Sequence, residues 1–271
     1  MRTLRVVSFI VVLALGYAMR GRLVDSVIFQ PTRGVAVTPA QLGIVGDDVY
    51  LETEDGVRIH AFYLPAPGSD IALLFLHGNA GNASHRLPNA AELVRLGCSV
   101  LLLDYRGYGL SDGRPSEAGA YADARAGLAH LIDQRGFPTD RVVVFGRSLG
   151  GAIAVDLARD LELAGVILES TFTSVADIAR GVGGPLLGAL AGRRFDAASK
   201  IDRIRAPLLF FHGDRDEVVD HALGRRLFDA APEPKSFETI SGAGHNDTTQ
   251  VGGRPYFERI RRFLAGVSSV S

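Results

Sequence analysis

Apolar and polar positions along this chain follow two periods that alternate. Short runs rich in Val, Leu, Ile and Phe, typical of strands buried on both faces of a parallel sheet, are separated by helix-forming segments. We predict strands at Ile71–Leu76, Ser99–Asp104, Arg141–Phe145, Gly165–Glu169, Pro207–His212 and Lys235–Ile240. We predict helices at Asn89–Leu96, Glu117–Gln134, Ala152–Arg159, Ala222–Ala230 and Tyr256–Leu264. This alternation favours one mostly parallel, doubly wound α/β sheet.

The sheet opens with a different pattern. Val49–Thr53 and Val57–Leu64 alternate their faces around Glu54-Asp55-Gly56, and an Asp-Gly turn between two such runs predicts an antiparallel hairpin. With this hairpin, the expected sheet has about eight strands. The pattern indicates no second domain, so residues 31–271 are expected to fold as one unit.

The alternation lapses after Glu169, where a small insertion at Ser170–Ile204 is broken by Gly181–Pro185. The insertion falls on the carboxyl side of the sheet, where a lid or a pocket wall is expected. A surface helix pair packed on the core is the alternative. The candidate substrate-pocket residues in this insertion are Phe172, Leu186, Leu187 and Leu190.

Residues 1–30 have a pattern of their own. Arg2 and Arg5 precede an uncharged apolar run at Val6–Met19. The run is shorter than the ~20 residues of a typical spanning helix, although flanking arginine stems extend its reach. We expect a single-pass N-terminal membrane anchor. The alternatives are a signal peptide cleaved after Ala18, which implies a secreted or periplasmic protein, and a buried helix.

Composition narrows the function classes. The net charge of −1 provides no basic excess, so no nucleic-acid partner is expected. The single cysteine, Cys98, excludes an intrachain disulfide, and its place before an apolar strand indicates a core residue. No cysteine and histidine residues have the spacing of a metal site, so neither a metal nor another cofactor is expected.

The segment Gly146–Gly151 (Gly-Arg-Ser-Leu-Gly-Gly) lies between a predicted strand and a predicted helix. A glycine-bracketed serine in this context is typical of a nucleophile elbow, a tight turn that exposes the serine hydroxyl. Side chains at Gly146 and Gly150 would clash in such a turn. The following helix directs its N-terminal amides toward an anion formed there. We therefore predict Ser148 as a nucleophile. The alternative is a glycine-rich turn with an incidental serine.

Other loops follow predicted strands, and the carboxyl ends of parallel strands share one edge of the sheet. His77–Asn82 (His-Gly-Asn-Ala-Gly-Asn) has the position of an oxyanion-hole loop. Asp104–Ser111 is glycine-rich without phosphate-loop spacing, and we expect it to pack beside the site. His245 lies in the glycine-flanked loop after the last strand, which makes it the candidate general base.

These motifs together resemble those of α/β-hydrolase-fold serine hydrolases. More narrowly, they resemble the membrane-anchored α/β-hydrolase-domain subgroup that includes protein depalmitoylases and related esterases. The resemblance covers nearly the whole chain and also rests on Ile28–Pro31 and Glu169-Ser170. It implies a triad of Ser148, Asp216 and His245. It further implies an oxyanion hole made by the backbone amides of Asn79 and Leu149.

Four carboxylates compete for the role of the acid. Asp216 lies four residues after His212, as the acid does in the family pattern His-Gly-x-x-Asp. Glu169 is the main rival, because some hydrolases of this fold place their acid at the end of the strand after the elbow. Asp214 is expected to bond to turn amides, and Glu217 to project elsewhere.

The implied activity is cleavage of carboxylic ester or thioester bonds through an acyl-enzyme, without a cofactor. The expected partner is a small-molecule or lipid acyl substrate with a short or medium acyl chain. The alternatives are a peptidase or amidase, a cofactor-free perhydrolase on the same fold, and a non-catalytic binding protein.

Overall fold

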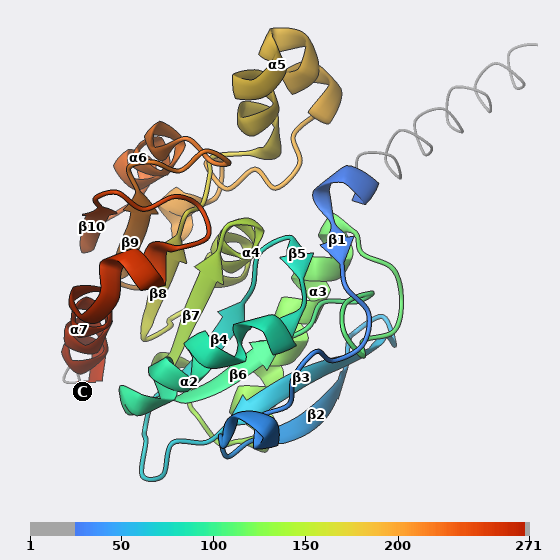
Figure 1. The fold of residues 1–271 in the computed structure, drawn as a ribbon, viewed down its shortest axis with the longest axis vertical. Coiled ribbons are helices and arrows are strands. Elements are labelled where there is room, and N and C mark those ends of the chain that lie inside the picture. Colours follow the sequence, from blue (N-terminus) through green and yellow to red (C-terminus); the bar gives the residue numbers. More distant parts are fainter. Residues whose placement is uncertain (1–24, 269–271) are drawn as a thin grey trace, which may run out of the picture.

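The computed structural model describes residues 25–268, and its centre is an eight-stranded sheet (Figure 1). The strands are β2 (Asp47–Glu52), β3 (Arg58–Leu64), β4 (Ala72–Leu76), β6 (Ser99–Leu103), β7 (Val142–Arg147), β8 (Gly165–Glu169), β9 (Leu208–Gly213) and β10 (Lys235–Ile240). Their order is β10-β9-β8-β7-β4-β6-β3-β2. Within this sheet, the β2–β3 and β3–β6 pairs are antiparallel and the other pairs are parallel. The predicted, mostly parallel sheet with an N-terminal hairpin is therefore confirmed.

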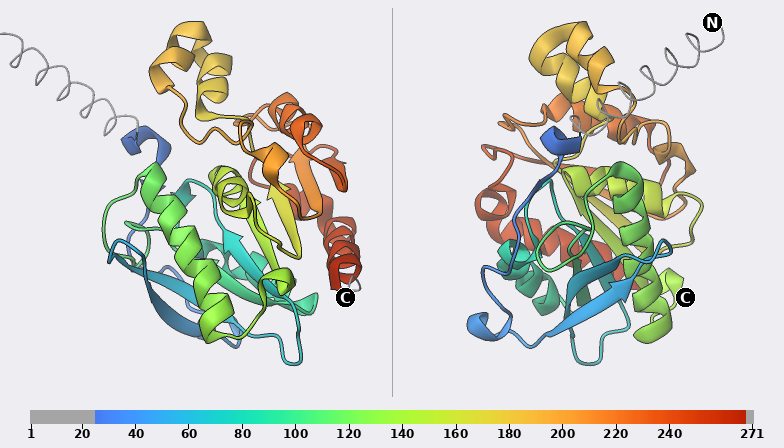
Figure 2. Two further views of the ribbon diagram at one scale, coloured as in Figure 1. Left: turned by 180° about the vertical axis from the view of Figure 1, so that it is seen from behind. Right: turned by 90° about the vertical axis from the view of Figure 1, so that its right-hand side faces the viewer.

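Helices cover both faces of the sheet (Figures 1 and 2). They are α2 (Leu87–Arg95), α3 (Glu117–Ala129), α4 (Leu149–Ala158), α5 (Val175–Ala191), α6 (His221–Ala230) and α7 (Thr248–Ser268). Successive strand residues point to opposite faces, so each strand serves two cores. In β7, Val144 joins the core under α3, α4 and α6, whereas Phe145 joins the core under α2 and α7.

A small second sheet, which the sequence pattern did not predict, connects the N-terminal part of the described chain to a loop of the carboxyl edge. Strand β1 (Gln30–Pro31) pairs in parallel with β5 (Ala80–Gly81), directly after β4. Phe29 secures this contact, because its ring packs edge-on against Tyr108 and Phe195 with centroid distances of 6.4 and 5.8 Å.

Helix α5 forms most of the insertion expected to be a lid, and it lies beyond the carboxyl ends of the strands (Figures 1 and 2). Gly183 and Gly184 have non-helical backbone angles and kink the helix before Pro185. Its outer part is apolar and open to solvent: Val182 is 81% exposed.

The expectation of a single-pass membrane anchor is corrected by the structure. Across residues 25–268, no helix has both the length and the apolarity to cross a bilayer. The longest one, α7, carries charged residues such as Arg254, Glu258 and Arg259 along its length. The run Val6–Met19, on which the membrane and transmembrane predictions rested, lies outside the described residues.

Candidate active site

Ser148 lies in the sharp turn between β7 and α4. Its backbone angles are φ 53° and ψ −116°, a strained conformation for a residue with a side chain. A Cβ atom on Gly146 would lie 2.4 Å from the carbonyl oxygen of Gly150, and one on Gly150 would lie 2.0 Å from that of Leu76. Both positions therefore require glycine, as the elbow motif predicts.

The structure brings Ser148, His245 and Asp216 together from the loops after β7, β10 and β9. The Nε2 atom of His245 lies 3.0 Å from the Oγ atom of Ser148. On the other side of the ring, Nδ1 lies 2.8 Å from Oδ2 of Asp216. Ser148 is 8% exposed and His245 is 7% exposed, so bulk water scarcely competes for these contacts.

The Asp216 carboxylate is held on both oxygens. Its Oδ1 accepts hydrogen bonds from the backbone amides of Val218 and Val219 at 2.9 and 2.8 Å. Burial raises the pKa of Asp216, but hydrogen bonds from His212 and His245 outweigh burial and leave the pKa well below its usual value. An ionised carboxylate at this position can accept a hydrogen bond from the Nδ1–H group of His245, and that tautomer leaves Nε2 free to accept a proton from Ser148.

The rival carboxylates have other partners. Asp214 accepts hydrogen bonds from the backbone of Gly242 at 2.6 Å and from the hydroxyl of Ser241 at 3.1 Å, so it fixes a turn. Glu217 is exposed to solvent. Glu169 is fully buried, and its carboxylate lies 3.0 Å from Nε of Arg147.

The Glu169 contact belongs to a network that sequence analysis missed. Glu169 also accepts hydrogen bonds from the hydroxyls of Thr248 at 2.7 Å and of Tyr256, both on α7. Nη2 of Arg147 donates to the carbonyl oxygen of His245 at 2.9 Å. A signal was present, because an arginine inside the elbow motif and a glutamate ending the neighbouring strand are both unusual among buried positions.

The loop after β4 lies against Ser148. A Cβ atom on Gly78 would meet the Cβ atom of Ser148 at 3.4 Å. The Asn79 carbonyl accepts hydrogen bonds from the amide of Gln30 at 3.0 Å and from the hydroxyl of Tyr108 at 2.6 Å. These contacts fix the Asn79 backbone at its carbonyl group.

The two backbone amides predicted to form the oxyanion hole belong to Leu149, which follows Ser148 directly, and to Asn79, which follows Gly78. Leu149 begins α4, and an amide at the first position of a helix has no intrahelical acceptor. The Asn79 amide belongs to the Gly78–Asn79 peptide, whose carbonyl accepts a hydrogen bond from Nδ1 of His77 at 2.7 Å. That hydrogen bond sets the orientation of the peptide plane.

The Asp104–Ser111 loop packs beside the site, as the sequence predicts. The Tyr105 hydroxyl donates to the carbonyl of His77 at 2.9 Å, and Tyr108 reaches Asn79 from the same loop. Burial raises the pKa of both tyrosines, so their hydroxyls remain protonated donors. Asp104 is buried and accepts the Ala83 amide at 2.8 Å, which holds the far end of the oxyanion loop.

The candidate pocket residues are divided by the structure. Phe172 is buried next to Thr171, whose hydroxyl donates to the Ser148 carbonyl at 3.0 Å. Leu186, Leu187 and Leu190 lie on α5 and are 72%, 43% and 49% exposed, so they do not enclose a pocket in this structure.

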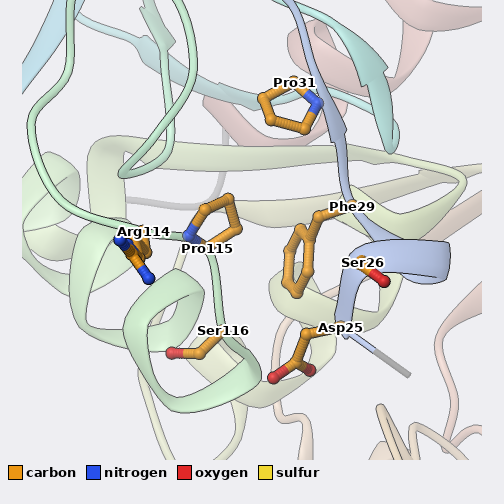
Figure 3. Close-up of a pocket in the computed structure, with 7 residues that line it drawn as sticks. All are labelled: Asp25, Ser26, Phe29, Pro31, Arg114, Pro115 and Ser116. Carbon is orange, nitrogen blue, oxygen red and sulfur yellow. The ribbon is translucent and has the colours of Figure 1, made fainter. Parts of the chain in front are cut away.

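A cavity of about 580 Å³ lies instead between the N-terminal part of the described chain and the start of α3 (Figure 3). Phe29, Pro31 and Pro115 supply apolar walls, and Asp25 and Arg114 supply charge. Its lining contains neither Ser148 nor His245, so the cavity is distinct from the candidate site described above.

The structure also bears on the predictions for a metal site and for Cys98. Over residues 25–268, no cluster of three or more His, Cys, Asp or Glu side chains has the arrangement of a metal site. Cys98 is buried, and burial raises the pKa of its thiol to about 12, which agrees with its predicted role as a core residue.

Known proteins are similar to this chain in sequence and architecture. Residues 68–199 and 195–249 match the family model described as serine aminopeptidase, S33. The chain is 40% identical over 272 residues to an uncharacterized protein of Mycobacterium tuberculosis, covering 97% of this chain and 95% of that protein. It is 35% identical over 255 residues to alpha/beta hydrolase domain-containing protein WAV2 of Arabidopsis thaliana, covering 86% and 83%. An esterase of Pyrococcus furiosus superposes with a TM-score of 0.75 and 25% identity, over 88% of this chain and 98% of that one.

Proposed function

The chain belongs to the serine aminopeptidase S33 family of α/β-hydrolases, and from this premise we propose that it cleaves carboxylic ester or thioester bonds through Ser148. The predicted α/β-hydrolase fold is confirmed by the sheet and by its structural relatives, and the family match supports a hydrolase. The observation that carries the proposal is the pair of hydrogen bonds of His245, 3.0 Å to Ser148 and 2.8 Å to Asp216.

The proposed mechanism assigns one task to each group. His245 accepts the Ser148 proton as Oγ attacks the acyl carbonyl, and Asp216 stabilises the imidazolium that forms. The amides of Leu149 and Asn79 stabilise the oxyanion, and one such donor lowers the activation free energy by about 3–4 kcal/mol. His245 then returns the proton to the leaving group, and water hydrolyses the acyl-enzyme with the same residues.

Amide cleavage is the second candidate, and the description of the family model supports it. The same nucleophile and base serve both reactions, but an amine leaving group must be protonated as it departs. The distinction therefore lies in how fast the enzyme turns over matched acyl groups with different leaving groups.

The proposal is tested by a substrate series on the full chain. p-Nitrophenyl esters and thioesters of graded acyl length are compared with amino-acid p-nitroanilides, with Ser148→Ala as the blank. We expect Ser148-dependent hydrolysis of esters and thioesters, fastest for short or medium acyl chains. Faster turnover of the anilides would favour the peptidase, and equal rates from acetyl to palmitoyl esters would remove the chain-length preference.

A further inference from the structure

Arg147 has no task in the proposed mechanism, although it precedes Ser148 directly. Its guanidinium donates through Nη2 to the carbonyl oxygen of His245 at 2.9 Å, and its Nε lies 3.0 Å from the Glu169 carboxylate. We propose that Arg147 is a positioning residue that fixes the His245 main chain, and so its imidazole, for proton exchange with Ser148. This inference rests on the proposed function, because it assigns Arg147 a role in the same proton transfer.

The arginine is itself held rigidly. Arg147 is 7% exposed and Glu169 is fully buried. The Glu169 carboxylate is fixed by Thr248 on one oxygen and by Tyr256 on the other. A planar guanidinium paired with a carboxylate that is itself fixed in this way has little freedom to move. A buried ion pair often adds little to stability, because desolvation of the two charges offsets their attraction. The hydrogen bond from Arg147 to the His245 carbonyl therefore explains why the ion pair is present better than a gain in stability does.

The His245 loop needs such a fixed point. It follows β10, which is the edge strand of the sheet and pairs with β9 alone. Asp214 fixes the start of this loop through Ser241 and Gly242, whereas the carbonyl of His245 itself accepts its hydrogen bond from Arg147. Arg147 reaches it from β7, which lies beyond β9 and β8 in the sheet. The backbone segment that carries Ser148 therefore also holds His245 in place. The distance between the two side chains is thus set by one rigid part of the structure.

Lysine cannot replace this arginine. Its ammonium is a point charge on a flexible stem, whereas the guanidinium presents separate donors to Glu169 and to the His245 carbonyl. A misplacement of about 1 Å in a catalytic group can cost on the order of 100-fold in rate. For Arg147→Lys we therefore expect kcat to fall by roughly 10–100-fold, with KM changed by less than about twofold.

A double-mutant cycle separates positioning from a general loss of structure. kcat and KM for p-nitrophenyl acetate are measured for wild type, Arg147→Lys, His245→Ala and the double variant, with Ser148→Ala as the blank. Arg147→Lys should reduce the residual kcat of His245→Ala by less than about twofold, because no imidazole is left to position. Equal losses in both backgrounds, or an unchanged kcat in Arg147→Lys, would overturn the inference.

Two further variants complete the test. Glu169→Gln keeps the side-chain shape and removes the charge that holds Arg147, so kcat should fall by about 3–10-fold even if Arg147→Lys folds poorly. Arg203→Lys is the matched control, because Arg203 pairs with Asp160 on the surface, and it should retain wild-type kcat. Full activity in Glu169→Gln would overturn the inference. A wild type without Ser148-dependent hydrolysis would overturn the proposed function itself, and the blank reveals that case.

Discussion

Glu169 contacts Ser148 through its main chain and directs its carboxylate elsewhere. The Ser148 amide donates to the Glu169 carbonyl at 2.8 Å, whereas the carboxylate accepts the Thr248 hydroxyl at 2.7 Å and pairs with Arg147. The strand end that supplies the acid in some related hydrolases therefore has a different task here. The main-chain carbonyl of Glu169 holds the Ser148 turn, and its carboxylate holds the Arg147 guanidinium.

Asp216 is therefore the expected triad acid, and substitution separates it from its rivals. Asp216→Asn should lower kcat by roughly 10⁴-fold, because an amide at this position imposes the wrong tautomer on His245. Asp214→Asn and Glu169→Gln should cost far less. The measurement is kcat for the three variants at pH 7, with folding checked by thermal melts. If Glu169→Gln were inactive and Asp216→Asn remained active, the acid would be Glu169 at the end of β8 and not Asp216 after β9.

Removal of the nucleophile gives the largest loss. Ser148→Ala should lower kcat by about 10⁶-fold, the cost of deleting a triad serine, and should abolish covalent labelling by a fluorophosphonate. The melting temperature should stay close to that of the wild type, since only a hydroxyl is lost. Labelling that persists in Ser148→Ala would show that another residue is the nucleophile.

Much of the fold can be predicted from the sequence, because burial in the sheet and the tight turn at Ser148 each require a recognisable local pattern of residues. Buried parallel strands require unbroken apolar runs, and β8 was predicted with the bounds that the structure has, Gly165–Glu169. The elbow was predictable because its turn excludes side chains at Gly146 and Gly150. The order of the loops then indicated which edge of the sheet carries the chemistry.

Other features left no such signal. The pairing of β1 with β5 involves two residues on each strand, too few to create a period. The hydrogen bonds from Gln30 and Tyr108 to one carbonyl join segments that are far apart in the chain. The exposed leucines of α5 resemble a buried face in sequence, and only the packed structure shows that the helix extends away from the sheet.

The elbow glycines make a sharper prediction about packing. In Gly150→Ala the new methyl group would lie 2.0 Å from the Leu76 carbonyl and 2.6 Å from that of His77. Both atoms are backbone and belong to the end of β4 and the oxyanion loop, so α4 must move. We expect a loss of about 1–3 kcal/mol in the free energy of unfolding and at least a tenfold loss in kcat. Gly34→Ala is a useful contrast, because its Cβ atom meets no atom within 4 Å, although its φ of +79° adds local strain.

His60 links the N-terminal hairpin to the loops behind the site. The side chain is fully buried, with Nε2 2.7 Å from Asp48 and Nδ1 3.3 Å from Asp104. Burial lowers the pKa of His60, but the hydrogen bonds to Asp104 and Asp48 outweigh burial and raise the pKa above its ordinary value of 6.5. A raised pKa in the folded state means that folding favours the protonated form. This contribution to stability is complete below pH 6.5 and is lost as the pH rises through the folded-state pKa.

The pH dependence of stability should therefore reveal the His60 ion pairs. His60→Gln should reduce the free energy of unfolding by roughly 2–3 kcal/mol at pH 5.5, and by less as the pH rises through the folded-state pKa, because the wild-type imidazole then loses its charge. Urea titrations of both proteins across this pH range provide the measurement. His221→Gln is the control, because burial and the nearby charges of His212 and Arg225 lower the pKa of His221, so its stability difference should not grow toward acid. A His60→Gln deficit that is constant from pH 5.5 to pH 9 would mean that His60 acts through packing and neutral hydrogen bonds alone.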